Sequence, residues 1–353
     1  MDDDVPWIRQ SHGHRVGYHN DNLFLFLHEK ILDFVVFVSP TERELARRHD
    51  LVREMCALVA TLWSDTTLEM FGSHDTQLFL PNSDIDMVVF VPASGASPLR
   101  KLAAQLRKNR VASSVEVIDK ARIPIVKFVH AASKLHVDVP LNVASRLETA
   151  SLVKGYVRAF PFFRPLMLAL KYFLAQRALN ETYTGGVGSF LAQLMVVSFL
   201  QHRRRNFGAN HDLPQHNNLG QLLLGFFTLY GSDFNYIDLG ISVRNGGSYF
   251  LKRDRGWSDW NRPTLLLVEN PNEPTVDVGK NSFNVATVRR AFDFARQVLT
   301  DEMRRRGKLP PQPGSILGVI IPPDSDLVEH TPPTAFGFPV LRIEHQKVPA
   351  EQL

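Results

Sequence analysis

The feature that most constrains the fold is a change of hydrophobic texture along the chain. Residues 67–139 alternate short β-branched or aromatic runs with turn residues, whereas apolar residues recur at helical spacing before and after them. Alternating runs predict strands, and apolar residues every three or four positions predict amphipathic helices. One basic helix is expected at 98–110. The strands are expected at 68–71, 84–91, 115–118, 123–130 and 135–139, which together predict a mixed sheet.

Helices dominate the chain on both sides of this segment. A first helix ends before Pro40, and a second begins near Thr41 with early acidic residues and runs to about Ser64. The later helices are expected at 149–158, 164–178, 188–204, 217–230 and 282–306.

Two structured domains follow from this organisation. A glycine-rich region at 231–281 adds two short predicted strands, 248–252 and 265–268, to the second domain. After Gly307, closely spaced prolines predict an extended, partly flexible tail. The predicted limits are an N-terminal arm and helix at 1–40, packed on the helical domain, an α/β domain at 41–148, a helical domain at 149–306 and a Pro-rich tail at 307–353.

Composition narrows the class of protein. With 44% hydrophobic and 22% charged residues, the chain can bury a sizeable core. Cys56 is the only cysteine, so an internal disulfide is excluded and a reducing compartment is expected. The net charge of +4 permits a phosphate-rich partner without requiring one. The longest nearly apolar run, 189–200, is short of the roughly 20 residues that span a bilayer, so no membrane partner is expected.

Two carboxylates in one apolar strand are the first chemical signal. Asp84 and Asp86 point the same way, because side chains alternate along a strand. Two such charges repel each other unless a cation lies between them, and Mg²⁺ suits carboxylates combined with substrate phosphates. The alternative is an Asp pair that simply faces water at a strand edge.

A third carboxylate, Asp138, lies in another apolar strand with His136 on the same face. Neighbouring strands are about 4.8 Å apart, so Asp138 could complete a two-metal cluster. One ion would activate a hydroxyl nucleophile and the other would stabilise a leaving pyrophosphate. Taken alone, Asp138 would be read as a solvated strand end.

Gly72 and Ser73 precede the Asp pair by eleven residues and offer a matching anion site. Glycine lets backbone approach a phosphate closely, and serine adds a hydroxyl and an N–H group. A Gly-Ser pair alone is common and carries little information, but its combination with an Asp pair at this distance is specific.

The segment FGSHDTQLFLPNSDIDMVVF, at 71–90, resembles the signature of DNA polymerase β-like nucleotidyltransferases. Two further segments, YTGGVGSFLAQLMVVSFL at 183–200 and LLLVENPNEPTVDVGKNSF at 265–283, resemble the non-canonical poly(A) polymerases that serve the TRAMP nuclear RNA surveillance complex. The resemblance covers roughly residues 20–305. It implies an α+β, two-domain nucleotidyltransferase with a small mixed-sheet catalytic (palm) domain, a larger, mostly helical central domain and an active site in the cleft between them.

The resemblance also implies roles for the palm residues. Asp84, Asp86 and Asp138 would be catalytic and hold two Mg²⁺ ions, with Mn²⁺ as the alternative, and Gly72 and Ser73 would contact the triphosphate. One departure is Gln77, where the family usually has glycine.

In the central domain the family pattern falls on three further residues. Lys171 would neutralise the β- and γ-phosphates, although a lysine on an amphipathic helix can also reach solvent. Ser189 would bind phosphate. Phe190, commonly Tyr in relatives, would stack on the base.

The loop at 269–280 would face the nucleobase. Its predicted nucleotide-binding residues are Glu269, Asn270, Val276 and Asp277, and Asn270 replaces the more usual Asp. Uridylyl-adding relatives tend to carry His where this chain has Val276, which favours ATP over UTP.

The resemblance therefore predicts a template-independent poly(A) polymerase that adds AMP from ATP to RNA 3′ ends, in the nucleus or alternatively the cytoplasm. A zinc-knuckle RNA-binding protein and an RNA helicase are the partners it implies. Two alternatives stay open: a terminal uridylyltransferase or relaxed nucleotide adder, and a catalytically silent RNA-binding scaffold. The arginine clusters at 203–205 and 304–306 would contact RNA phosphates or form solvated helix ends.

Overall fold

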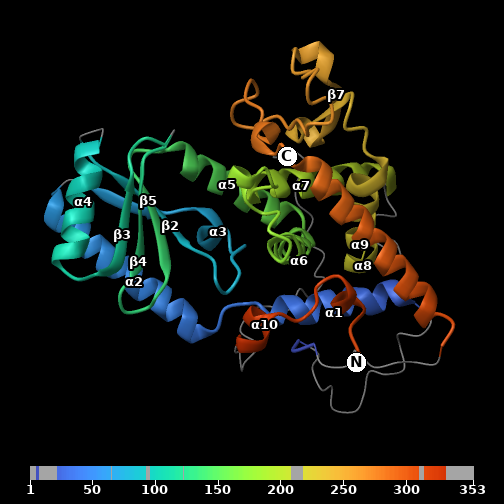
Figure 1. Cartoon of the computed structure of the whole chain (residues 1–353), viewed down its shortest axis with the longest axis horizontal. Helices are drawn as coiled ribbons and strands as arrows, with labels where there is room; N and C mark the ends of the chain where they lie inside the picture. Colours follow the sequence, from blue (N-terminus) through green and yellow to red (C-terminus); the bar gives the residue numbers. More distant parts are fainter. Residues whose placement is uncertain are drawn as a thin grey trace. The chain divides into compact units, whose positions relative to one another are not determined.

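The structure is a computed structural model that describes residues 5–7, 22–64, 66–92, 96–121, 123–207, 218–309 and 314–330. The described residues form two compact units (Figure 1). One unit is Ser39–Arg158, and the other contains the described residues up to Val38 and those of 159–330. The second division comes after Arg158 and not at the predicted limit of 148, so the helix at Ser145–Ala159 lies mostly in the smaller unit.

The smaller unit is built on a mixed five-stranded sheet. Its strand order is β1-β2-β5-β4-β3, and β2 and β5 are parallel whereas the other neighbours are antiparallel. The strands are β1 (Thr67–Met70), β2 (Ile85–Phe90), β3 (Ala112–Ile118), β4 (Ile125–His130) and β5 (His136–Pro140). The helices are α2 (Glu42–Leu62), α3 (Gly72–Asp75), α4 (Ala96–Lys108) and α5 (Ser145–Ala159).

Helices α2 and α4 cover one face of this sheet (Figure 1). Alternate strand residues such as Ile85, Met87 and Val137 are buried beneath them. Thr41 starts α2 with a capping box, in which its hydroxyl accepts from the Glu44 backbone N–H and the Glu44 carboxylate accepts from the Thr41 N–H. Because side chains alternate, the residues between the buried ones point to the opposite face. That face carries the candidate site.

The larger unit is mostly helical. Its helix α1 packs against α6 and α8, and Phe173, Phe226 and Phe292 contribute to an aromatic core. The long helices are α1 (Leu23–Phe37), α6 (Phe163–Ala175), α7 (Ser189–Phe207), α8 (Leu219–Thr228) and α9 (Val285–Arg306). The shorter elements are η1 (Thr182–Thr184), the π-helix η3 (Leu229–Asp233), β6 (Leu239–Ser242), η4 (Arg244–Gly246), β7 (Ser248–Leu251), η5 (Lys252–Arg255), η6 (Gly279–Asn281), η7 (Ile316–Val319) and α10 (Ser325–Glu329).

One strand predicted for this unit is wrong, and another strand was missed. Residues 265–268 do not form a ladder strand, because Val268 alone makes an isolated bridge, to Ile241. The strand that pairs with β7 is β6, a short Gly-containing segment that the sequence did not reveal.

The tail is also not extended where it is described. Residues 314–330 contain η7 and α10, and Ile316, Leu317 and Ile320 are fully buried. The Tyr172 hydroxyl donates to the Asp324 carboxylate at 2.7 Å and fixes this segment to α6. The remaining tail lies outside the described residues. Across the ranges that are described, no helix has both the length and the apolar character needed to cross a membrane.

Candidate active site

Two of the three predicted carboxylates share the sheet face opposite α2 and α4, and the third lies just before one of the two strands. In the parallel pair β2–β5, Asp86 is directly opposite Asp138, and Ile85 is opposite Val137. Directly paired residues point to the same side of a sheet, so both carboxylates share one face. Asp84 immediately precedes β2 and is exposed. The register therefore brings together residues more than fifty positions apart in the sequence.

Burial and neighbouring charges both act on this group. Burial, and then the nearby charge of Asp138, raises the pKa of Asp84 above its usual value. Lys127, which the sequence reasoning missed, donates from Nζ to Oδ2 of Asp138 at 2.7 Å. Burial alone would lower the pKa of Lys127, but the hydrogen bond and the charge of Asp138 outweigh it and raise that pKa. The cluster thus behaves as a site of excess negative charge.

These residue types fit a hard divalent cation, although the side chains are not arranged as a finished metal cage. Within the described ranges, no group of three or more His, Cys, Asp or Glu side chains is placed so that it could hold a metal ion. One oxygen of Asp138 is bonded to Lys127 instead. Burial and the charge of Asp138 disfavour the ionised form of Asp84, and a bound Mg²⁺ or Mn²⁺ would favour it. The metal ligand assignment stays a prediction.

The Gly72-Ser73 turn packs directly against this cluster. Gly72 has φ +68°, and a Cβ atom there would lie 2.2 Å from Oδ2 of Asp86. The backbone N–H of Leu78 donates to the Ser73 carbonyl at 2.8 Å, and the Thr76 hydroxyl donates to the Gly72 carbonyl at 2.9 Å. Gln77 adopts φ +57°, the left-handed conformation that the glycine usual in the family would take without strain. Gln77 therefore holds a backbone conformation that favours glycine.

A buried arginine supports the loop between the turn and Asp84. Arg48 of α2 is 2% exposed, and its Nη2 donates to the carbonyls of Pro81 and Ser83, both at 3.0 Å. Its guanidinium lies 4.8 Å from the centre of the Phe79 ring, which stacks on His74 at 5.1 Å. Burial, followed by the charge of Arg48, lowers the pKa of His74 to about 4.

Sequence reasoning missed Arg48 although a signal was present. It precedes the buried residues Leu51 and Met55 by three and seven positions, on the apolar side of α2. A charged residue on a buried helix face needs partners, so this position predicts a supporting contact.

Three predicted nucleotide-binding residues lie on helices of the larger unit. Lys171 is half-buried on α6. Ser189 is exposed at the start of α7, and Phe190 follows it half-buried. Their roles towards a nucleotide stay predictions.

The loop at 269–279 is closed by its own backbone and acidic side chains. Glu269 and Asp277 form an antiparallel bridge, and the Asn270 N–H donates to the Val276 carbonyl at 2.9 Å. Oδ1 of Asp277 accepts from the N–H groups of Val268 and Gly279 at 2.9 and 2.8 Å.

Glu269 is buried at 2% exposure and ion-paired through both oxygens. Arg244 lies 3.3 Å from one oxygen, and Arg255 lies 3.0 Å from the other. Burial alone would raise the pKa of Glu269, but hydrogen bonds from Ser242, Arg255 and Arg244 hold it below its usual value. Glu269 and Asp277 thus hold the loop in shape, and Val276 is left partly exposed on it. Contact of any of these residues with a base stays a prediction.

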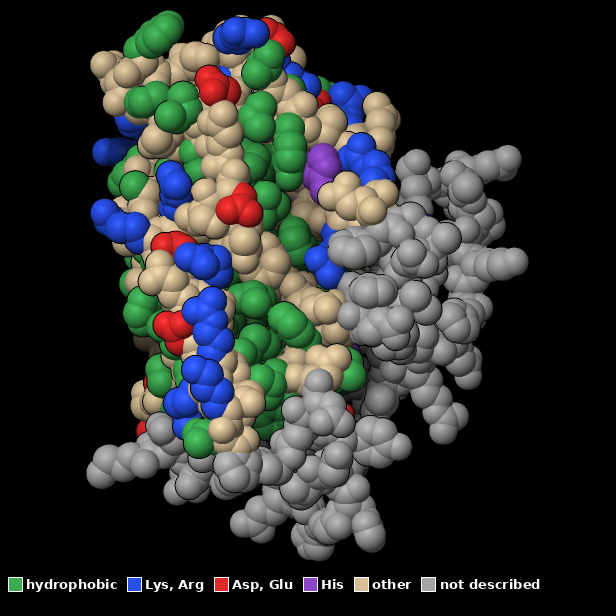
Figure 2. Space-filling model, turned by 90° about the vertical axis from the view of Figure 1, so that its right-hand side faces the viewer, with side chains coloured by type: hydrophobic (Ala, Val, Ile, Leu, Met, Phe, Trp, Pro, Cys, Tyr) green, Lys and Arg blue, Asp and Glu red, His purple; other side chains and the backbone are tan. Residues whose placement is uncertain are grey.

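Most arginines of the two clusters have partners within the chain. Arg304 pairs with Asp301, whereas Arg305 and Arg306 both pair with Glu302. In the other cluster, Arg205 donates to the carbonyls of Gly246 and Gly247. Figure 2 shows Lys and Arg side chains interspersed with hydrophobic and acidic ones on the face turned towards the viewer. These contacts favour the helix-end interpretation over an RNA-binding patch.

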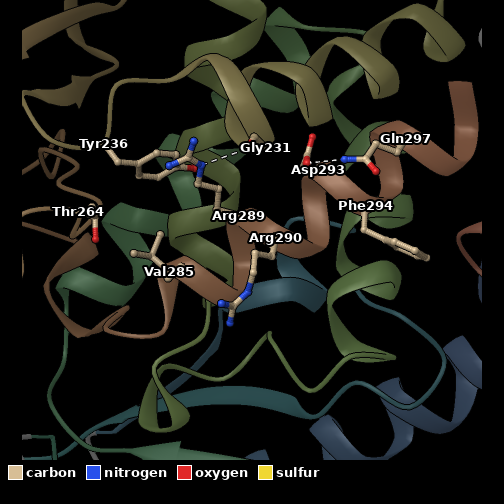
Figure 3. Close-up of a pocket in the computed structure, with 10 residues that line it drawn as sticks. Gly231, Tyr236, Thr264, Val285, Arg289, Arg290, Asp293, Phe294 and Gln297 are labelled. Carbon is tan, nitrogen blue, oxygen red and sulfur yellow. Dashed lines mark hydrogen bonds between the residues drawn. The ribbon is translucent and has the colours of Figure 1, made fainter.

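A pocket of about 480 Å³ lies between η3 and α9 in the larger unit (Figure 3). Its polar side chains are largely bonded to neighbours, since Arg289 donates to the Gly231 carbonyl at 3.1 Å and Gln297 donates to Asp293 at 2.7 Å. The residues predicted to bind nucleotide are absent from its lining. The pocket is separate from the candidate site residues.

The five-stranded mixed sheet with its carboxylate-bearing face, together with a helical unit, defines a nucleotidyltransferase fold. The solved polymerase core of TRAMP, an RNA surveillance complex, superimposes with a TM-score of 0.81 and 34% identity, over 90% of this chain and 99% of that chain. Residues 27–158 match the family model of the central palm domain of mitochondrial-like poly(A) RNA polymerase, and residues 218–276 match the Cid1 family poly A polymerase model.

Curated relatives agree with these matches. Poly(A) RNA polymerase cid14 of Schizosaccharomyces pombe is 39% identical over 303 residues, which cover 84% of this chain and 43% of that protein. The inactive non-canonical poly(A) RNA polymerase protein Trf4-2 of Drosophila melanogaster is 36% identical, over 76% of this chain and 67% of that protein. The chain belongs to the non-canonical poly(A) RNA polymerase family. It spans 37–51% of the length of the first five curated relatives it matches.

Proposed function

We propose that this chain is a template-independent poly(A) polymerase, which adds AMP from ATP to RNA 3′ ends. The observation that carries the proposal is the β2–β5 register, which sets Asp86 opposite Asp138 on one sheet face beside Asp84 and the Gly72-Ser73 turn. Membership of a family whose named relatives are poly(A) RNA polymerases supports the same reaction.

The chain's own residues would hold, orient and neutralise the reactants. Asp84, Asp86 and Asp138 would hold divalent ions, which when bound activate the RNA 3′-hydroxyl and stabilise the leaving pyrophosphate. The Gly72-Ser73 turn, which packs against Asp86 because Gly72 has no Cβ, would offer backbone groups to the triphosphate. Lys171 would balance phosphate charge, and Ser189 and Phe190 would contact the phosphate and the base. Positioning and charge stabilisation supply most of the rate enhancement in such phosphoryl transfers.

ATP is the proposed nucleotide because Val276 occupies the position at which uridylyl-adding relatives tend to carry histidine. An apolar side chain there offers no hydrogen bond to a uracil carbonyl. The alternative, a uridylyltransferase or a relaxed nucleotide adder, keeps the same metal chemistry and differs only in this loop.

The test is extension of a labelled single-stranded RNA with Mg²⁺ and each NTP supplied separately. We expect ATP to lengthen the RNA and Asp84→Ala to abolish extension while the fold is kept. Asp119→Ala is the matched control, because Asp119 is a surface carboxylate paired with Arg100 beyond β3. Extension by Asp84→Ala at the wild-type rate would refute the mechanism, and a UTP preference would refute the nucleotide assignment.

A silent scaffold is the second candidate, because one relative is named inactive. The presence of all three carboxylates in this chain favours activity. If the purified chain does not extend RNA with any of the four nucleotides, the assay is repeated with a zinc-knuckle RNA-binding partner. Failure there too would favour the scaffold.

We also propose nuclear RNA surveillance as the setting, with cytoplasmic RNA processing as the alternative. The similarity to the TRAMP polymerase core supports it. A zinc-knuckle RNA-binding protein and an RNA helicase are the proposed partners. Imaging of the tagged chain and affinity purification from nuclear extract test the setting, and an exclusively cytoplasmic signal would contradict it.

A further inference from the structure

A lysine stands in the same row of the sheet as the two paired carboxylates. Asp138 of β5 is opposite Asp86 on one side, in β2, and opposite Lys127 on the other side, in β4. Since directly paired residues share a face, the row presents two carboxylates and one ammonium group side by side.

The ammonium is bonded to one carboxylate although another is available. Lys127 is also directly opposite Glu116 of β3, so an acidic residue flanks it on each side. Its Nζ lies 2.7 Å from Oδ2 of Asp138. The Asp138 side chain is 19% exposed and that of Lys127 is 44% exposed, so the lysine has more room to move into solvent than the carboxylate has. Lys127 pairs with Asp138 and not with Glu116 because negative charge is concentrated around Asp138, which lies beside Asp86 and near Asp84.

We propose that Lys127 is a place-holding cation for the metal site. It neutralises Asp138 while no metal is bound, and it leaves Asp138 when a divalent ion binds. The cluster of three carboxylates then never faces its full charge of −3, because either the lysine or the metal offsets it. The inference rests on the proposed function, because it takes Asp84, Asp86 and Asp138 as the metal ligands.

Two consequences separate this role from an ordinary surface ion pair. The lysine and the metal compete for Asp138, so loss of the lysine charge should tighten metal binding. The carboxylates would repel each other without either cation, so the same loss should destabilise the metal-free protein. Glu116 faces Lys127 from the other side of the same row, so it offers a matched control.

The experiment titrates the full chain with Mn²⁺ alone and follows the free ion by electron paramagnetic resonance, with thermal unfolding measured in EDTA and in Mn²⁺. Lys127→Met and Lys127→Gln are expected to bind Mn²⁺ on the order of fivefold more tightly, the ratio for one charge at about 4 Å in water-like screening. Both should unfold at a lower temperature in EDTA and gain more from Mn²⁺ than wild type. Lys127→Arg keeps the charge and Glu116→Gln leaves the lysine in place, so both should resemble wild type.

Mn²⁺ affinity that is equal or weaker in both neutral variants overturns the inference, and so does wild-type stability of both in EDTA. Circular dichroism identifies a variant that fails to fold, and the other neutral variant then decides. If no form of the chain binds Mn²⁺ while RNA extension is intact, the inference is wrong and the proposed function stands. If the variants bind Mn²⁺ as expected but the chain extends no RNA, the inference stands and the proposed function is wrong.

Discussion

Gly72 lies so close to Asp86 that a methyl group on its Cα atom would be 2.2 Å from the carboxylate oxygen Oδ2. Because Gly72 also has φ +68°, the position excludes side chains both sterically and conformationally. The turn that is proposed to receive the triphosphate and the carboxylate that is proposed to hold the metal are therefore one packed unit. A change in either should disturb both.

Gly72→Ala is expected to reduce RNA extension by about 100-fold. The added methyl group would displace the Asp86 carboxylate, and a misplacement of about 1 Å in a catalytic group can cost that much. Stability should fall by at least about 1–2 kcal/mol, the cost of a left-handed alanine, because displacement of Asp86 adds to it. Gly155→Ala in α5 is the control, since a Cβ there meets nothing within 4 Å, and it should leave extension unchanged. Steady-state extension kinetics and denaturant unfolding of both variants check the prediction, and near-normal kinetics in Gly72→Ala would contradict it.

Gln77 offers a stability prediction in the same turn. Its φ of +57° places a side-chain-bearing residue where glycine has no conformational cost. Gln77→Gly should therefore be more stable than Gln77→Ala by about 1 kcal/mol. Comparison with alanine cancels the loss of the glutamine side chain. Urea unfolding measures the difference, and equal stability of the two variants would show that the turn relaxes.

Part of the candidate site followed from the sequence, because strand alternation predicts Asp86 and its neighbour Asp84 on one side, and the structure has Asp84 immediately before β2. The sequence allowed Asp138 to lie on a neighbouring strand but did not determine the strand order. β2 pairs with β5 and not with the nearer β3, and that choice depends on tertiary packing that no local pattern records. Lys127 could be recognised only once this register was known, since eleven positions separate it from Asp138.

The errors in the larger unit have a similar origin. The apolar run at 265–268 has the composition of a strand, yet it is buried among other elements and pairs only at Val268. In the tail, prolines suggested extended chain, but the apolar residues at 316–321 include four that are fully buried. The apolar residues determine the structure of this segment, whereas the prediction relied on the prolines.

The buried Lys252 is predicted to be essential for the stability of the larger unit. It is 2% exposed, and its Nζ donates to the carbonyls of Tyr236, Pro263 and Leu265 at 2.6, 3.0 and 2.7 Å. Lys252→Met fills the space but leaves these carbonyls without a donor, at an expected cost of about 3 kcal/mol. Lys280→Met, at an exposed position, should change stability by less than about 0.5 kcal/mol. Denaturant unfolding that shows equal stability for the two variants would contradict this role.

Glu269 should contribute stability in a pH-dependent way. Its pKa in the folded state is below the usual 4.5, so its contribution is complete above that pH and is lost as the pH falls through the lower, folded value. Glu269→Gln should cost about 2 kcal/mol at pH 7, because Arg244 and Arg255 lose a charged acceptor. The difference from wild type should shrink progressively below about pH 4.5. Unfolding at a series of pH values tests this, with the exposed Glu273→Gln as control; a difference that does not depend on pH would contradict the ion-pair explanation.

Val276 gives the sharpest test of nucleotide choice. It lies partly exposed on a loop whose shape is maintained by Glu269 and Asp277, so a substitution at Val276 should change the loop's surface more than its backbone. Val276→His adds a hydrogen-bonding ring that can recognise a uracil carbonyl, and one such bond is worth about 1.4 kcal/mol, or about tenfold. We therefore expect the ratio of kcat/KM for UTP to that for ATP to rise about tenfold, whereas Val276→Leu leaves it unchanged. Single-nucleotide extension kinetics measure the ratio. An equal rise in Val276→Leu would mean that the size of the side chain, and not its hydrogen bonding, sets the preference.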